Sequence, residues 1–185
     1  MNQTGELDIP FGFTVTERCD DLVITYPWFG WRCLVTLLCC IIWNAFLAVW
    51  YRVVIPLHGP QSLVLLPILH VAVGIYLVYA TLTGFVNRTK IRMDSSWLMV
   101  RHYPLPWLGN RTIPLRNIEY FYFKDTSSPA DDGFSPNYAV MIAVHGGRHI
   151  KLIRSLVREH HANFIVQTLT QHLRNTDTPS PVRPG

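Results

Sequence analysis

Residues 33–51 read CLVTLLCCIIWNAFLAVWY, and residues 62–86 read SLVLLPILHVAVGIYLVYATLTGFV. Neither run contains Asp, Glu, Lys or Arg. At about 1.5 Å per residue, each run is long enough as a helix to cross a hydrocarbon layer of about 30 Å. The sequence therefore predicts two transmembrane helices, at residues 32–55 and 62–86.

A short external loop, residues 56–61, joins the two predicted helices, so they are expected to be antiparallel neighbours with both chain termini on one side. Arg52 alone lies beside this loop. The opposite ends of the helices are flanked by a larger basic set: Arg18, Arg32, Arg88, Lys90 and Arg92. The positive-inside rule then places both termini in the cytoplasm of a multi-pass plasma-membrane protein.

The composition divides the chain into an acidic and a basic flank around the apolar runs. Of the 185 residues, 49% are hydrophobic and only 15% charged, which excludes intrinsic disorder. Residues 1–31 hold five Asp/Glu against Arg18 alone, whereas residues 87–185 hold thirteen Lys/Arg against seven Asp/Glu. Either the acidic arm docks on the basic domain, or the domain faces anionic lipid headgroups. Nucleic acid is not an expected partner, because the basic residues form no run.

Two polar residues, Asn44 and His70, interrupt the predicted helices. Helix geometry places them at similar depths from the external ends, so we expect an intramembrane polar contact, an interhelical hydrogen bond. The alternative is a proton or ligand site, since ionisable groups inside a bilayer are often functional. His70 is the only ionisable group of this kind, and a two-helix hairpin has no interior for a relay, which favours the hydrogen bond.

Short alternating segments on both sides of the apolar runs predict an antiparallel sheet. Residues 13–17 and 22–26 have the pattern of a hairpin, which is only marginally stable unless it joins a larger sheet. Six further strands are predicted at residues 89–93, 97–102, 111–115, 118–124, 138–145 and 148–153. Residues 156–174 have helical spacing, and residues 176–185 are expected to be a flexible tail.

Several local motifs carry a resemblance to a known family. They are Val86 to Arg92, Leu98 to His102, Pro104 to Trp107, Gly109 to Arg111, and Ile118-Glu119. In these motifs the chain resembles an uncharacterised bacterial family of two-span membrane proteins. The resemblance implies location in the bacterial inner membrane and a pleckstrin-homology-like (PH-like) cytoplasmic domain.

The expected fold class is therefore an α+β membrane protein. Its two-helix hairpin is inserted into a PH-like antiparallel barrel or sheet, with one C-terminal amphipathic helix. The N-terminal arm, residues 1–31, joins the sheet of the cytoplasmic domain, residues 87–175. The resemblance is silent on activity.

Two sets of residues are candidates for binding a partner or lipid. Pro104 and Pro106 fix an extended loop around Trp107, whose side chain would contact a partner, enter the headgroup layer or pack under the sheet. Arg88, Lys90 and Arg92 share one face of a predicted strand. They would hold anionic headgroups or only satisfy the positive-inside rule.

No motif predicts catalysis, a cofactor or a metal. The four cysteines form neither a disulfide framework nor a spaced ligand set, and His160 and His161 are adjacent on a predicted helix, where they point about 100° apart. We therefore expect no catalytic, cofactor-binding or metal-ligating residues. The expected function is that of a non-enzymatic membrane-anchored interaction or scaffold module, whose partners are membrane lipids, a membrane protein or further copies of this chain. The alternative is an accessory subunit of a larger membrane transport or electron-transfer complex.

Overall fold

The computed structural model describes residues 9–18, 21–58, 65–127, 137–156 and 158–177. The chain divides into two units, which we describe separately: residues 27–88, and residues 1–26 together with 89–185. Parts of the predicted external loop and tail, residues 59–61 and 178–185, lie outside the described residues.

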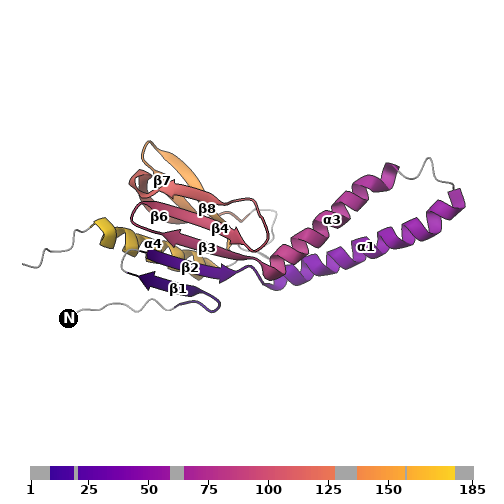
Figure 1. The fold of residues 1–185 in the computed structure, drawn as a ribbon, viewed down its shortest axis with the longest axis horizontal. Helices are drawn as coiled ribbons and strands as arrows, with labels where there is room; N and C mark the ends of the chain where they lie inside the picture. Colours follow the sequence, from indigo (N-terminus) through magenta and orange to yellow (C-terminus); the bar gives the residue numbers. More distant parts are fainter. Residues whose placement is uncertain (1–8, 19–20, 59–64, 128–136, 157, 178–185) are drawn as a thin grey trace, which may run out of the picture. The chain divides into compact units, whose positions relative to one another are not determined.

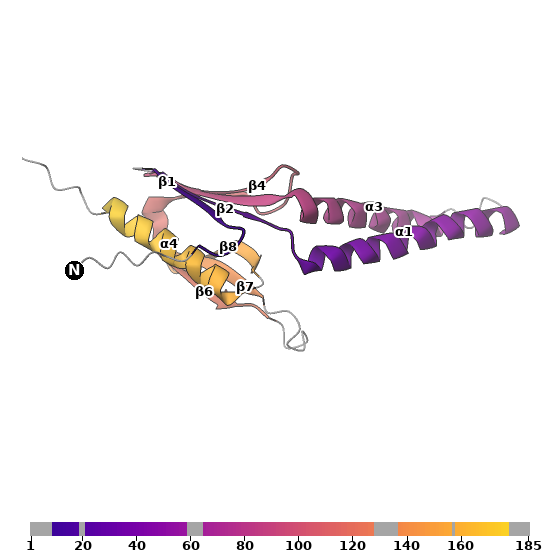
Figure 2. The same ribbon diagram turned by 90° about the horizontal axis from the view of Figure 1, so that it is seen from below.

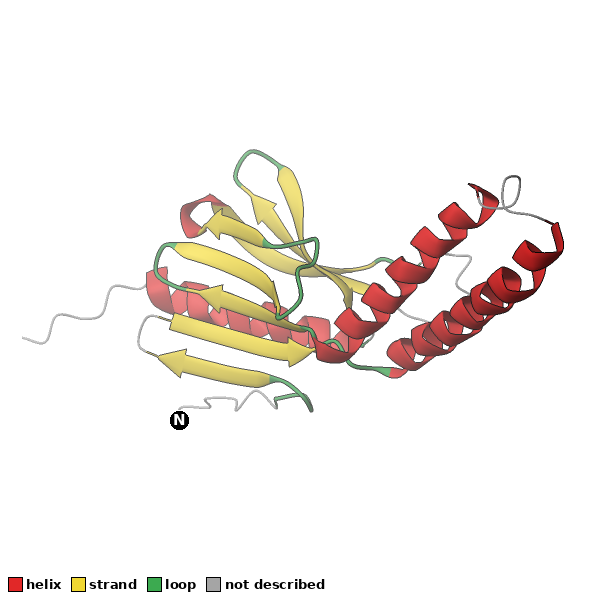
Figure 3. Cartoon of the chain, turned by 45° about the vertical axis from the view of Figure 1, so that its right-hand side comes forward, coloured by secondary structure: helices red, strands yellow, loops and turns green. Residues whose placement is uncertain are grey.

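The first unit is a pair of antiparallel helices, α1 (Trp31–His58) and α3 (Leu65–Val86), shown in red in Figure 3. Both contain a segment that is long and apolar enough to cross a membrane, Trp31–Val53 and Ile68–Val86. Contrary to the predicted loop boundary, α1 continues through Pro56 to His58. A proline this close to a helix C-terminus removes only one late hydrogen bond, so the helix tolerates it.

The two helices pack along a seven-residue repeat. Cys33, Cys40 and Leu47 of α1 are buried and recur at this period, and Gly74 and Thr81 of α3 do the same. Such a repeat keeps one side of each helix against its neighbour in left-handed packing. We call these residues the heptad seam.

In the second unit, five antiparallel strands form one sheet in the order β1-β2-β3-β4-β5 (Figure 1). They are β1 (Thr14–Arg18), β2 (Asp21–Pro27), β3 (Arg88–Met93), β4 (Trp97–Tyr103) and β5 (Arg111–Pro114). The β1–β2 hairpin precedes α1 in the chain, and β3 follows α3. The helix pair is thus an insertion between two strands of one sheet.

A short 3-10 turn, Leu115–Asn117, leads into a second antiparallel sheet in the order β6-β7-β8. Its strands are β6 (Ile118–Asp125), β7 (Tyr138–Val144) and β8 (Arg148–Leu156). Gly146 and Gly147 both have positive φ in the β7–β8 turn, a conformation that glycine adopts without a steric cost. Helix α4 (Glu159–Asp177) follows and packs against all three strands.

The core lies between the two sheets and α4. Alternation along β2, β3 and β4 turns one set of side chains inward, and Leu22, Ile24, Ile91, Leu98 and Val100 are almost completely buried. Figure 2 shows α4 and the second sheet on this inner side of the five-stranded sheet.

The N-terminal hairpin is attached to α4 by an aromatic cluster and a side-chain hydrogen bond. Phe13 stacks on Tyr26 at 5.1 Å and contacts His161 at 4.9 Å between ring centroids. Glu17 lies 3.4 Å from Nδ1 of His172, which is buried on α4. Burial raises the pKa of Tyr26 to about 12.

The structure confirms the α+β class, the two apolar helices and the antiparallel sheets predicted from the sequence. Most strand ends shift by one residue or less from the predicted boundaries, but β8 runs three residues further, to Leu156. Helix α4 correspondingly begins at Glu159, because Leu156 is buried as part of the sheet.

Candidate functional site

The predicted basic residues lie on the outer face of the five-stranded sheet. Along β3, the side chains of Thr89, Ile91 and Met93 are buried, whereas Arg88 and Arg92 are exposed and Lys90 is half-buried. This alternation places all three cations on the face that points away from α4 and the second sheet. We call it the outer face.

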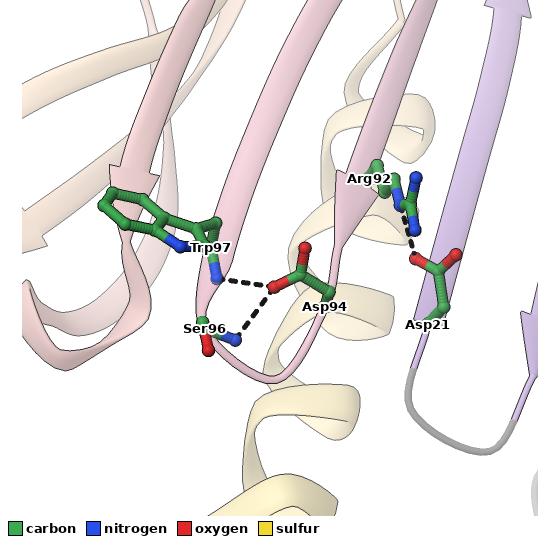
Figure 4. Close-up of polar contacts among 5 residues, drawn as sticks. All are labelled: Asp21, Arg92, Asp94, Ser96 and Trp97. Carbon is green, nitrogen blue, oxygen red and sulfur yellow. Dashed lines mark hydrogen bonds and ion pairs between the residues drawn. The ribbon is translucent and has the colours of Figure 1, made fainter.

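Arg92 already has an acidic partner within the sheet. Its Nε donates to Oδ1 of Asp21 on β2 at 3.0 Å (Figure 4). Both side chains remain partly exposed, so the pair contributes about 0–1 kcal/mol. The charge of Arg92 is nevertheless balanced locally, which makes it a weaker candidate than Arg88 or Lys90 for holding an external anion.

Strand β4 adds a cation that sequence reasoning missed. The Asp94 amide donates to the Trp97 carbonyl, and Thr89 is hydrogen-bonded to His102. These two contacts imply one antiparallel register, in which Arg101 lies across from Lys90. Arg101 is exposed on the outer face. Its alternation with Trp97 and Met99 was the signal in the sequence, but only the strand pairing brings it to Lys90.

Directly opposed like charges on neighbouring strands are destabilising unless an anion lies between them. Within the described part of the chain, the acidic side chains in contact with a basic side chain or a histidine are Asp21, beside Arg92, and Glu17, beside His172. Among the described residues, Arg88, Lys90 and Arg101 therefore have no acidic partner. The outer face carries uncompensated positive charge beside β2.

In the loop after β4, residues 104–110, the side chain of Leu108 is more exposed than that of Trp107. Pro104 and Pro106 are exposed, as is typical of an extended loop, but Trp107 is half-buried. The next residue, Leu108, is 92% exposed. No sequence signal distinguishes which of these two adjacent apolar residues points outward, because the turn geometry decides it.

His102 holds this loop in place. Its backbone amide donates to Oδ1 of Asn110 at 2.8 Å, and its Nδ1 lies 3.0 Å from Oγ1 of Thr89. Gly109 has a φ of +119° and passes so close to the imidazole that an added Cβ would lie 3.0 Å from Nε2. Burial lowers the pKa of His102, so the ring is neutral at pH 7.

Asn44 and His70 lie near the heptad seam but interact with different groups. The Asn44 amide donates to the Cys40 carbonyl of its own helix at 2.8 Å. His70 instead stacks on Trp43, with ring centroids 5.6 Å apart, and its carbonyl accepts a 3.0 Å hydrogen bond from Nε1 of Trp43. Trp43, the residue before Asn44, thus donates the interhelical hydrogen bond that was predicted for Asn44.

The histidines of the second unit form separate contacts. Tyr122 is hydrogen-bonded to His149 at 3.0 Å, and the rings of His160 and His161 lie 4.3 Å apart. Among the residues that the structure describes, no group of three or more His, Cys, Asp or Glu side chains is arranged to hold a metal ion.

No protein-family model matches the chain, and a search of curated proteins found no match.

Proposed function

We propose that this chain is a non-enzymatic, membrane-anchored interaction module of the bacterial inner membrane. The two helices span the bilayer and hold a basic PH-like domain at its cytoplasmic face. The order of antiparallel strands followed by one C-terminal helix supports the PH-like assignment. The motifs from Val86 to Glu119 support membership of the two-span family.

One observation carries the proposal: two long apolar helices are inserted between adjacent strands of one sheet. Only 17% of each candidate span is buried, whereas a core helix of a soluble protein would be mostly buried. Their outward apolar side chains need a hydrocarbon solvent. The chain connects the helices to the sheet through residues 28–30 and Asn87, and such short connections would keep the domain of a spanning hairpin at the bilayer surface.

Alkaline carbonate extraction of native membranes tests the anchoring. We expect the full chain to remain in the membrane pellet, because burial of the two spans does not depend on charge. Release into the supernatant together with peripheral proteins would overturn the proposal.

Capture of the tagged chain in mild detergent tests the contact function. We expect Trp107→Ala, or Arg88→Glu with Arg92→Glu, to reduce co-purification of its partner, and Arg148→Glu on the second sheet to leave it unchanged. Unaltered capture of the partner by both variants would contradict a contact role for the 104–110 loop and for the outer face.

The Trp43–His70 stack favours a second candidate, an accessory subunit of a larger membrane complex. In that case the helices make the important contacts, and Asn44→Leu or His70→Leu would release the partner. The same capture experiment therefore discriminates the two functions.

A further inference from the structure

Among the described residues of the second unit, the two most exposed large apolar side chains lie at the same end of the five-stranded sheet, beside different strands. Leu108 follows the end of β4, and the fully exposed Phe11 precedes β1. Thr14 pairs with Thr25, so β1 begins where β2 ends. Antiparallel order puts the end of β4 beside the start of β3. We call this the helix-joined end, because the chain leaves it for α1 and returns to it from α3.

Two apolar side chains with this exposure at one end of a sheet favour a covered end in the working protein when other interfacial residues lie beside them. At the same end, Tyr103 is exposed as the last residue of β4 and Arg88 as the first residue of β3. Aromatic and basic residues beside exposed apolar ones are the combination found at a bilayer interface.

Chain length restricts what can cover this end. Arg88 is only two residues beyond Val86, the last residue of α3, a separation of at most about 7 Å. If α3 spans a bilayer, Arg88 therefore lies at the level of the lipid headgroups. Lys90 and Arg101 follow one pleat further along the outer face, and their long side chains can reach phosphate at that level.

We propose that the helix-joined end is a lipid-binding surface. Leu108 and Phe11 enter the interfacial layer, while Arg88, Lys90 and Arg101 bind the phosphates of anionic phospholipids in the bilayer that the helices span. The anion also relieves the repulsion between Lys90 and Arg101. This inference rests on the proposed membrane anchoring and names the partner of the outer face.

Native mass spectrometry of the full chain tests the lipid preference. Phosphatidylglycerol or phosphatidylcholine is titrated into the detergent-solubilised protein, and the binding constant of the first lipid is compared. We expect phosphatidylglycerol to bind more tightly. Lys90→Gln with Arg101→Gln should weaken its binding by roughly tenfold or more, because each cation near an anionic surface contributes about fivefold. The control, Arg116→Gln with Arg148→Gln, removes two exposed cations elsewhere and should change nothing.

Hydrogen exchange in nanodiscs tests the apolar contact separately. Amides of Leu105, Trp107 and Leu108 should exchange more slowly in a bilayer than in detergent, and Leu108→Asp should abolish this difference. Tyr120→Asp, at an exposed position on the second sheet, is the control. All the replaced side chains are at least partly exposed, so unchanged unfolding temperatures should verify that the variants fold.

Equal phosphatidylglycerol binding by the wild type and the Lys90/Arg101 variant would overturn the inference. So would release of an acidic protein by that variant with lipid binding unaltered, since the face would then serve a protein partner. Carbonate extraction distinguishes failure of the lipid-binding inference from failure of the membrane-anchoring proposal. A chain retained in the membrane without a lipid preference refutes only the lipid surface, whereas an extracted chain refutes the anchoring itself.

Discussion

Gly84 of α3 packs against Cys33 of α1. Sγ of Cys33 donates to the Gly84 carbonyl at 3.4 Å, and an added Cβ at Gly84 would lie 2.9 Å from that sulfur. Gly84→Ala should therefore destabilise the helix pair by roughly 1–3 kcal/mol through overpacking. Thermal unfolding in detergent measures the loss.

A double-mutant cycle isolates the contact. Cys33→Ala removes the sulfur, so Gly84→Ala should cost much less in that background. Ala72→Val adds carbon at an exposed position of α3 and serves as the control. Equal costs of Gly84→Ala in both backgrounds would show that the sulfur does not set the helix spacing.

His161 makes the second unit sensitive to acid. Burial, with smaller contributions from His160 and Arg158, lowers its pKa from the ordinary 6.5 to about 4. The unfolded chain thus binds a proton more readily than the folded chain between these values. The stability contributed by the neutral ring is complete above pH 6.5 and is lost as the pH falls towards 4.

We therefore expect the unfolding temperature of the second unit to fall as the pH decreases from 6.5 to about 4. His161→Phe keeps an aromatic ring against Phe13 but cannot be protonated, so its decline should be shallower. His145→Phe, at an exposed histidine whose printed contact is made by its backbone amide, controls for general effects of removing an imidazole. Parallel pH profiles of His161→Phe and the wild type would assign the acid sensitivity to other groups.

Among the elements, the β3–β4 turn depends on one carboxylate. Oδ1 of Asp94 accepts hydrogen bonds from the amides of Ser96 at 2.9 Å and Trp97 at 2.8 Å (Figure 4). Asp94→Ala leaves two turn amides without this acceptor and should lower the free energy of unfolding by about 1–2 kcal/mol. Asp94→Asn keeps an acceptor and should recover most of the loss.

Asp21→Asn provides the comparison, because it weakens only the exposed pair with Arg92 and should cost less than about 1 kcal/mol. Urea unfolding of the wild type and the three variants ranks their free energies of unfolding. If Asp21→Asn were as costly as Asp94→Ala, the ion pair rather than the turn would hold β3 in the sheet.

Periodicity along the chain was sufficient to predict most elements of this fold. Alternation identified β3 and β4, and charge-free length identified the helices, since both signals are local. Contacts between residues that are distant in the sequence were harder to predict. Arg101 lies beside Lys90 only because of the register between β3 and β4. In the helix pair, Trp43 rather than Asn44 donates to the His70 carbonyl, because adjacent residues on a helix point about 100° apart. Leu108 is more exposed than Trp107 for a similar reason, because the turn that Gly109 completes sets the direction of each side chain.

At the scale of the whole molecule, the helix hairpin links the pairing of β2 with β3 to the side of a membrane on which the sheet can lie. Because α1 and α3 are inserted between β2 and β3, both halves of the sheet must lie on the same side of any membrane that the helices span. The pairing of β2 with β3 therefore fixes both halves of the sheet on one side, and the positive-inside rule predicts that this side is the cytoplasm. Residues 87–185 have thirteen basic residues, whereas Arg52 is the only charged residue from Cys33 to Val86.

This arrangement predicts the accessibility of two exposed positions in living cells. A cysteine in place of Arg52, near the C-terminal end of α1, should react with a membrane-impermeant maleimide in intact cells. A cysteine in place of Ser95, in the β3–β4 turn, should react only after permeabilisation. Labelling of the unchanged chain measures the background reaction of its native cysteines. Reaction of both variants after permeabilisation shows that each site is reactive. Labelling of Ser95→Cys in intact cells would place the sheet outside, and the cations of β3 would then face the external leaflet.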